Sequence, residues 1–120
     1  MTQIVAISIY VNDLDKAVAF YSEVLGFAVK ARPVPFIVEL EHEGPALVLC
    51  QAERPERLDY SKASGTVVGI MVKDLAAKLR ELTAKKVELI HKTPEEFPGG
   101  KFVALRDPAG NVIELLQFGA

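Results

Sequence analysis

Four polar side chains, those of Ser8, Tyr10, Cys50 and Glu114, fall on predicted strands where they could share one pocket. Glu114 has the clearest chemical potential. A carboxyl group that points into an apolar pocket without a charged partner is hard to ionise, so it can act as a general acid or base. If Arg106 or a lysine reaches Glu114, the pair is structural instead. The sequence leaves both interpretations open.

The cysteine and the two histidines offer weaker candidates. Cys50 would need a basic or cationic neighbour to form a thiolate, and no histidine lies near it in the sequence, so we interpret it as a small buried hydrophobe. His42 lies between Glu41 and Glu43 at a predicted turn, which is typical of a solvated residue. His91 ends a predicted strand and could reach a pocket rim, where it would be structural or respond to pH.

The first half of the chain predicts one strand, one helix and three further strands. A β-branched run at 4–11 is typical of a strand, and Asn12-Asp13 can cap a helix whose apolar spacing begins at Leu14. Gly26 lies where that helix should stop. Three strands follow at 27–30, 36–41 and 46–51, separated by Pro33, Pro35 and Glu43-Gly44-Pro45.

The second half repeats this order after a polar linker at about 53–64. A strand at 67–72 is followed by a second cap, Lys73-Asp74, and a helix at 75–86. Three strands are predicted at 87–91, 102–106 and 112–118. We therefore expect an α+β fold in a single domain over 1–120, with module 1 at about 1–52 and module 2 at about 65–120.

Matching residues at constant offsets support the repeat. Val11, Asp13 and Leu14 recur with one common spacing as Val72, Asp74 and Leu75. Phe36, Gly44 and Gln51 recur with a second, slightly longer common spacing as Phe102, Gly110 and Gln117. The difference between the two offsets is accommodated in loops, where insertions are tolerated.

Two segments resemble hallmarks of the vicinal-oxygen-chelate superfamily, which includes glyoxalase I, bleomycin-resistance proteins and extradiol dioxygenases. They are YVNDLDKAVAFYSEVLGF (10–27), similar to V-x-D-L…FY…LGF, and FVALRDPAGNVIELLQ (102–117), similar to DP-x-GN-x-IEL. The resemblance implies two tandem βαβββ modules, with cupped mixed sheets facing one pocket and helices outside. We interpret residues 107–111 as a structural turn in which Pro108 and Gly110 set the backbone.

The resemblance also implies where a metal would bind. Members that use a metal place one ligand on the first and one on the last strand of each module, which gives positions Ala6, Val48, Val67 and Glu114 here. Alanine and valine carry no donor atom, and a lone carboxylate holds a divalent ion weakly. We therefore expect neither a bound metal nor another cofactor.

Strand alternation indicates which side chains line the cup. On the first strand, alternation places Ala6, Ser8 and Tyr10 in the cup. Their equivalents in module 2, at the offset that relates Val11 to Val72, are Val67, Gly69 and Met71. The alternative is that the apolar members simply fill the cup. The predicted ligand-binding residues are Ala6, Ser8, Tyr10, Val48, Cys50, Val67, Gly69, Met71, Glu114 and Leu116.

The leading hypothesis is a metal-independent binding protein of the glyoxalase and bleomycin-resistance type. It would hold an apolar or aromatic small molecule in the cup, where the acid could meet a cationic group. The alternative is a glyoxalase-like lyase or isomerase that uses Glu114 as acid or base, assisted by Tyr10 or Ser8. A third possibility is a structural or regulatory module that works through its surface.

Composition and charge indicate which classes of partner and which compartment to expect. The formal net charge is −2 and the basic residues are scattered, which argues against nucleic acid. No apolar run approaches the roughly 18 residues that cross a bilayer, and the N-terminal sequence lacks the features of a secretory signal. With its single cysteine, the chain is expected to be cytoplasmic. We expect a homodimer, because members of the superfamily commonly complete their cups by pairing modules across chains.

Overall fold

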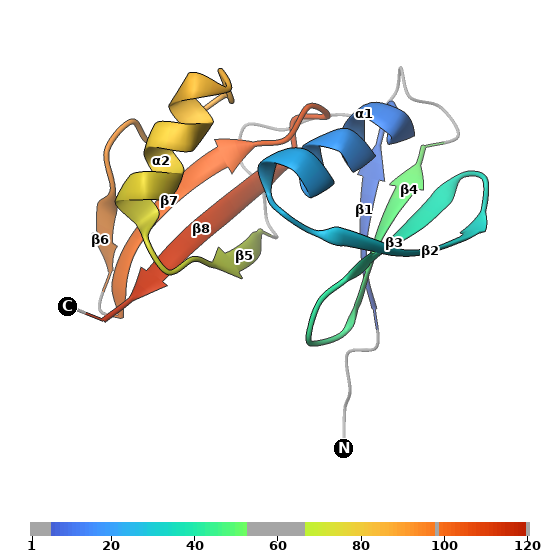
Figure 1. Cartoon of the computed structure of the whole chain (residues 1–120), viewed down its shortest axis with the longest axis horizontal. Helices are drawn as coiled ribbons and strands as arrows, with labels where there is room; N and C mark the ends of the chain where they lie inside the picture. Colours follow the sequence, from blue (N-terminus) through green and yellow to red (C-terminus); the bar gives the residue numbers. More distant parts are fainter. Residues whose placement is uncertain (1–5, 53–66, 98, 120) are drawn as a thin grey trace. The chain divides into compact units, whose positions relative to one another are not determined.

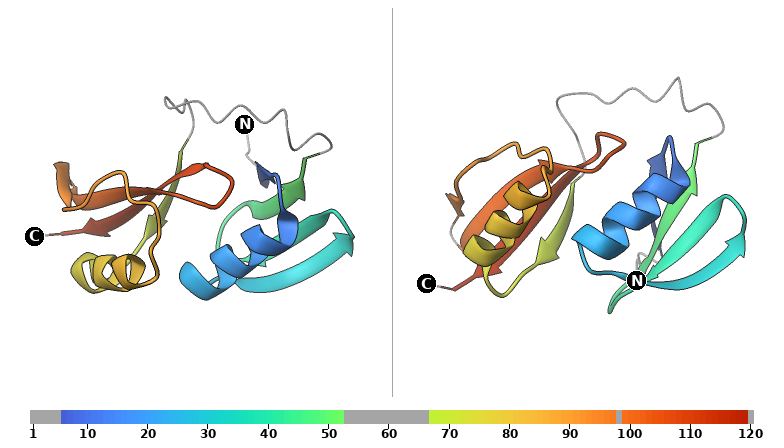
Figure 2. Two further views of the ribbon diagram at one scale, coloured as in Figure 1. Left: turned by 90° about the horizontal axis from the view of Figure 1, so that it is seen from above. Right: turned by 45° about the horizontal axis from the view of Figure 1, so that its top comes forward.

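The computed structural model describes residues 6–52, 67–97 and 99–119, and the chain divides between residues 60 and 61 into two compact units (Figure 1). Unit 1 and unit 2 correspond to the two predicted modules. Each has a four-stranded mixed sheet with a helix packed on one face (Figure 2). The structure confirms the α+β class and the tandem arrangement. No helix in these three ranges is long and apolar enough to cross a membrane.

Unit 1 contains four strands and one helical segment. Its elements are β1 (Ala6–Val11), α1 (Leu14–Ala19), the π-helical turn η1 (Phe20–Val24), β2 (Ala28–Val34), β3 (Ile37–Glu41) and β4 (Ala46–Gln51). The strand order is β1-β4-β3-β2, in which β1 runs parallel to β4 and the other pairs are antiparallel.

Unit 2 repeats this topology. Its elements are β5 (Val68–Met71), α2 (Leu75–Ala84), β6 (Glu95–Phe97), β7 (Gly100–Arg106) and β8 (Val112–Phe118). The strand order is β5-β8-β7-β6, and β5 runs parallel to β8. The first and last strands are therefore neighbours in each sheet.

The repeated aspartates and glutamines hold the helix starts in both units. The Asp13 side chain accepts a hydrogen bond from Lys16 N–H at 3.1 Å, and Asp74 accepts one from Ala77 N–H at 3.0 Å. These are N-caps, as predicted. Gln51 Oε1 accepts from Leu14 N–H at 2.8 Å, and Gln117 Oε1 accepts from Leu75 N–H at 2.7 Å.

The core of each unit lies between the helix and the sheet. In unit 2 the strand residues facing α2 are fully buried, and burying each such side chain contributes roughly 1.5–3 kcal/mol. They are Val103, Leu105, Ile113 and Leu115, and Leu75 and Leu82 of α2 are buried with them. In unit 1 the buried set includes Val11, Val38, Leu40, Leu47 and Leu49 with Leu14, Ala17 and Tyr21.

The predicted strand at 87–91 is wrong. This segment meets β7 through one isolated bridge, Leu89 to Leu105, and the edge strand is β6 instead. The N–H groups of Ile90 and His91 both donate to the carbonyl oxygen of Ala104, at 2.9 and 3.3 Å. Because two consecutive donors converge on one acceptor, the alternating ladder of a strand does not form.

Two further expectations need correction in unit 1. Pro33 does not end a strand, since β2 runs to Val34; it is an edge strand, where a missing N–H costs no ladder bond. Phe36 is not the counterpart of Phe102. Ile37 pairs with Cys50 as Phe102 pairs with Leu116, so Ile37 is the structural equivalent of Phe102.

The turn between β7 and β8 has the predicted structural role. Asp107 is buried, and its Oδ1 accepts hydrogen bonds from the N–H groups of Ala109 at 2.9 Å and Asn111 at 2.8 Å. Its Oδ2 accepts from Asn111 Nδ2 at 3.0 Å, and Gly110 has a φ of +92°. The aspartate therefore organises the turn.

Candidate functional site

The sheet of unit 2 has one face packed against α2 and an opposite face that carries the polar candidate. Residues directly across from each other on neighbouring strands point to the same face. Glu114 on β8 pairs with Gly69 on β5 and with Ala104 on β7. Leu116, two residues further along β8, pairs with Met71 and Phe102.

Aromatic rings extend this face towards the end of the sheet. Phe97 and Phe118 both pair with Gly100, which puts them on the side of Phe102. The ring centroids of Phe97 and Phe102 are 6.1 Å apart and those of Phe97 and Phe118 are 5.8 Å apart, both edge to face. We call the following set the aromatic face: Gly69, Met71, Glu95, Phe97, Phe102, Ala104, Arg106, Glu114, Leu116 and Phe118.

Small neighbours flank the Glu114 side chain. Gly69 and Ala104, its cross-strand partners, are the two smallest side chains on the aromatic face. A Cβ atom at Gly69 would lie 2.9 Å from Leu116 Cδ1, so the tip of Leu116 already occupies part of the space that glycine leaves. Met71, the next residue of β5 on this side, is 74% exposed. The half-buried carboxyl group therefore lies among apolar groups at an accessible surface.

The proposed structural partner of Glu114 is bound elsewhere. Arg106 Nε lies 3.1 Å from Glu88 Oε2, and its NH1 donates to the Gly110 carbonyl oxygen at 2.9 Å. Among the described residues, no ion pair involves Glu114. Of the two interpretations left open by the sequence, the structure disfavours the pair with Arg106.

His91 lies at the edge of the aromatic face and has a structural contact. Its Nδ1 accepts a hydrogen bond from Ala104 N–H at 3.1 Å, which places the ring proton on Nε2. Its ring meets Phe102 edge to face, with centroids 5.3 Å apart. His91 thus supports both β7 and the Phe102 ring. The Nε2 of His42 donates to the Pro45 carbonyl oxygen within its turn, and His42 is exposed, as predicted.

The equivalent face of unit 1 has a different chemistry. Ser8 pairs with Val48, and Tyr10 pairs with Cys50. Glu39 on β3 shares this face through its pairing with Val48, and its Oε2 lies 3.6 Å from Lys30 Nζ. The acid of the unit 1 face therefore has a cationic partner, whereas Glu114 has no ion pair among the described residues.

Cys50 is buried on the unit 1 face, and desolvation raises the pKa of its thiol above the usual value. A hydrogen bond with Ser8 acts in the opposite direction and is the smaller effect. The thiol therefore stays protonated at neutral pH, which fits the interpretation of a small buried side chain rather than a nucleophile.

The structure divides the predicted ligand-binding residues between the two units. Ala6, Ser8, Tyr10, Val48 and Cys50 share the unit 1 face, where Ala6 pairs with Ala46. Gly69, Met71, Glu114 and Leu116 share the aromatic face, and half-buried Val67 directly precedes β5.

Sequence reasoning missed the aromatic residues and Glu39. The signal was present for three of them, because Phe102, Phe118 and Glu39 follow from the same alternation along predicted strands. Phe97 could not be found in this way, since the strand that carries it was placed at 87–91.

The donor set at the implied metal positions does not fit a divalent ion. Ala6, Val48 and Val67 carry no nitrogen, oxygen or sulfur in their side chains, which leaves the carboxylate of Glu114. Across the ranges 6–52, 67–97 and 99–119, no three His, Cys, Asp or Glu side chains are grouped as metal ligands would be. A stable site needs several converging donors.

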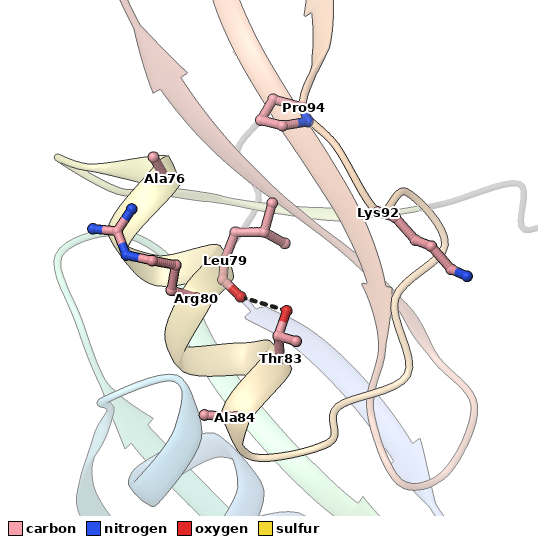
Figure 3. A pocket seen from close by; sticks show the side chains of 7 residues that line it. All are labelled: Ala76, Leu79, Arg80, Thr83, Ala84, Lys92 and Pro94. Atoms are coloured by element: carbon pink, nitrogen blue, oxygen red, sulfur yellow. Dashed lines mark hydrogen bonds between the residues drawn. The ribbon is translucent and has the colours of Figure 1, made fainter.

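A separate pocket lies between α2 and residues 92–94 (Figure 3). Its lining residues are Ala76, Leu79, Arg80, Thr83, Ala84, Lys92 and Pro94. The Thr83 hydroxyl donates to the Leu79 carbonyl oxygen at 2.8 Å, and Figure 3 shows the Arg80 and Lys92 side chains extending to opposite sides. Its polar groups do not converge, so it is a weaker candidate than the aromatic face.

Comparison with known proteins gives matches along nearly the whole chain. The sequence model of the Glyoxalase/Bleomycin resistance protein/Dioxygenase superfamily matches residues 3–115. The uncharacterized protein YurT of Bacillus subtilis (strain 168) is 29% identical over an alignment 129 residues long. The alignment covers 96% of this chain and 98% of YurT.

Solved structures show the same fold. Lactoylglutathione lyase from Agrobacterium tumefaciens has a TM-score of 0.73 at 25% identity, over 98% of this chain and 94% of the lyase. TnmS3, an antibiotic binding protein from Streptomyces sp. CB03234, has a TM-score of 0.72 at 24% identity, over 99% of this chain and 98% of TnmS3. The fold is therefore shared by proteins described as an enzyme and as a binding protein.

Proposed function

Because the chain belongs to the Glyoxalase/Bleomycin resistance protein/Dioxygenase superfamily, we propose that it is a metal-independent small-molecule-binding protein whose ligand is apolar or aromatic. The ligand lies against the aromatic face of unit 2. The observation that carries this proposal is the run of edge-to-face rings of Phe97, Phe102 and Phe118 beside a half-buried acid on the side of the sheet away from α2.

The chemistry of this face supports binding. Ligand sites are mostly apolar and contain a few polar groups that orient the ligand. An added aromatic ring gains about 0.5–1.5 kcal/mol from stacking, beyond the area that it buries. Phe118 and Met71 are 58% and 74% exposed, so large apolar side chains are available for contact. The antibiotic binding protein TnmS3 has the same fold, which supports the binding class.

Metal independence is supported by the donor set. Members of the superfamily that use a metal place donors on the first and last strands of each module, and three of these positions hold Ala6, Val48 and Val67 here. The proposal therefore uses no metal step.

A ligand screen by thermal unfolding tests the proposal. We expect neutral bicyclic aromatic compounds to raise the melting temperature, since a ligand that binds only the folded state stabilises it. Phe102→Leu keeps an apolar side chain but removes the ring, and should abolish the shift. Phe36→Leu removes an exposed ring of unit 1, in the turn before β3, and is the matched control. Equal shifts in the two variants, or no shift with any compound, would contradict the proposal.

Glu114 supports a second candidate function, a glyoxalase-like lyase or isomerase. Its lack of an ion pair among the described residues leaves the carboxyl group available for proton transfer. The test is turnover of a glutathione hemithioacetal in the presence of a chelator. Activity that is lost in Glu114→Gln, with unchanged melting temperature, would establish the enzyme. Equal rates in wild type and variant would assign any activity to another group.

We also propose that the protein is a homodimer. Large apolar side chains remain exposed in both units, including Tyr10, Val29, Phe36 and Ile90, and a second copy would cover some of them. Sedimentation should give twice the chain mass of 13.1 kDa. A monomer at high micromolar concentration would contradict the proposal, while a two-fold interface burying more than about 1,200 Å² would support it.

A further inference from the structure

The charges on the sheet of unit 2 are distributed unequally between its two faces. Strand pairing puts Glu95, opposite Phe102, on the aromatic face together with Glu114. Glu96 and Lys101 pair with each other on the α2 side. The strands place one cation on the aromatic face, Arg106, which pairs with Val112.

Arg106 does not neutralise these two acids. Its Nε lies 3.1 Å from Glu88 Oε2, and its NH1 donates a hydrogen bond to the Gly110 carbonyl oxygen. Among the described residues His91 forms no ion pair with either acid, and its Nδ1 accepts the hydrogen bond from Ala104 N–H. Within the described part of unit 2, the aromatic face therefore has acids without cationic partners beside exposed and half-buried rings.

We infer that the ligand of the aromatic face is an aromatic organic cation whose charged group binds Glu114 while its ring packs on Phe102, an inference that rests on the proposed function. An anionic ligand would be repelled by Glu95 and Glu114. A neutral ligand would cover the carboxylate without giving it a partner, and burying an unpaired charge is costly. A cation avoids this cost and is also attracted to aromatic ring faces.

The residues beside Glu114 on the neighbouring strands are small, and the flexible tip of Leu116 occupies part of the space at Gly69. The neighbours of Glu114 across the strands are Gly69 and Ala104, so no long side chain from β5 or β7 competes for the carboxylate at this register. Phe102 lies two residues from Ala104 on the same strand and face. Residues two apart on a strand are about 6–7 Å apart, which a bicyclic ring with an attached cationic nitrogen spans.

Three probes of matched shape test the inference on the full chain: N-methylquinolinium, neutral 1-methylnaphthalene and anionic 1-naphthoate. Affinities are measured by NMR titration. We expect the cation to bind at least tenfold more tightly than the neutral probe, equivalent to about 1.4 kcal/mol, and the anion to bind most weakly. Glu114→Gln should remove most of the preference for the cation and leave the affinity for 1-methylnaphthalene and the melting temperature unchanged.

Glu39→Gln is the matched control, because Glu39 is the acid of the unit 1 face and is already paired with Lys30. It should leave the preference intact. Salt provides a test that does not depend on a variant. Raising the ionic strength from about 0.01 M to about 1 M shortens the Debye length from about 30 Å to about 3 Å, and should weaken binding of the cation but not of the neutral probe.

The outcomes separate the two proposals. Equal affinity for the cationic and neutral probes would overturn the inference and leave the proposed function standing. Failure of all three probes would overturn both. A preference for the cation that survives Glu114→Gln and disappears in Glu95→Gln would show that Glu95 recognises the charge. That result would overturn the inference, which assigns this role to Glu114.

Discussion

The two units share one hydrogen-bonded framework but have different chemistry on the faces opposite their helices. In unit 1 this face carries Ser8 and Val48, and its acid, Glu39, is paired with Lys30. In unit 2 the corresponding pair is Gly69 and Glu114, and phenylalanine rings lie alongside. The framework thus leaves this face free to diverge, which is how one fold carries different functions.

The helix-facing side shows why the divergence is confined to one face. Leu49 and Leu115, equivalent residues of β4 and β8, are both fully buried. Replacing a buried leucine with a smaller residue leaves a cavity and costs about 2–5 kcal/mol. Val48 and Glu114 precede them on the opposite face and are only half-buried, so the packing constraint at these two positions is weaker. Side chains there can change without loss of the fold.

Filling the space beside Glu114 should have the largest effect. In Gly69→Val the added side chain meets Leu116 and covers the approach to the acid, while a β-branched residue suits a strand. We expect affinity for 1-methylnaphthalene and N-methylquinolinium to fall at least about thirtyfold, roughly 2 kcal/mol, with little change in melting temperature. Ser8→Val puts the same side chain at the equivalent position of unit 1. An equal loss of affinity in Ser8→Val would assign the ligand to both faces.

The glutamines that link each last strand to its helix should show a smaller difference. Gln51 also donates through Nε2 to the carbonyl oxygens of Asn12 at 2.8 Å and Ala52 at 3.3 Å. Among the described residues, the Gln117 side chain makes only its bond to Leu75. Each such bond contributes about 0.5–1.5 kcal/mol net.

The free energy of unfolding should therefore fall by roughly 2 kcal/mol in Gln51→Ala and about 1 kcal/mol in Gln117→Ala, measured by urea denaturation. The reverse order would mean that the extra bonds of Gln51 contribute nothing.

The thiol of Cys50 should produce a weak dependence on alkaline pH. Burial raises its pKa in the folded state, so its contribution to stability is present below the ordinary thiol pKa and is lost as pH rises through the folded-state value. We expect wild type to lose more stability than Cys50→Ala above about pH 8.5. The folded protein should also react more slowly with a thiol reagent at neutral pH than the urea-unfolded chain. Equal rates in the two states would show that the thiol is accessible.

Chelation and metal addition should have no effect. Removing divalent ions and then adding zinc, nickel or manganese should leave the melting temperature unchanged, because three of the four implied positions have no donor atom. Stoichiometric binding with micromolar affinity at the sheet face would contradict the assignment of these positions.

Local signals in the sequence predicted the framework well. Asp13 and Asp74 marked the helix starts because an N-cap acts within three residues of its own position. Alternation placed Ser8 and Glu114 on their faces because side chains alternate along every strand.

The predictions that failed concern features that depend on residues distant along the chain. The 87–91 segment matches a strand pattern, but its backbone donors converge on Ala104, which alternation cannot reveal. The same limit applies to Glu114, since the ion pair that occupies Arg106 involves Glu88, which precedes both β6 and β7 in the chain. Pairing between separate segments is set by tertiary packing, so the chemical state of the acid could not be read from its motif.

In each unit the first and last strands are side by side, so the strands of one unit pair into one complete open sheet. β1 pairs with β4, β5 pairs with β8, and neither sheet contains a strand from the other unit. Gln51 and Gln117 link the last strand of each unit to the start of its helix. The hydrogen bonds within each sheet therefore depend on one half of the chain alone, and a change in the segment that joins the two units would leave these bonds intact.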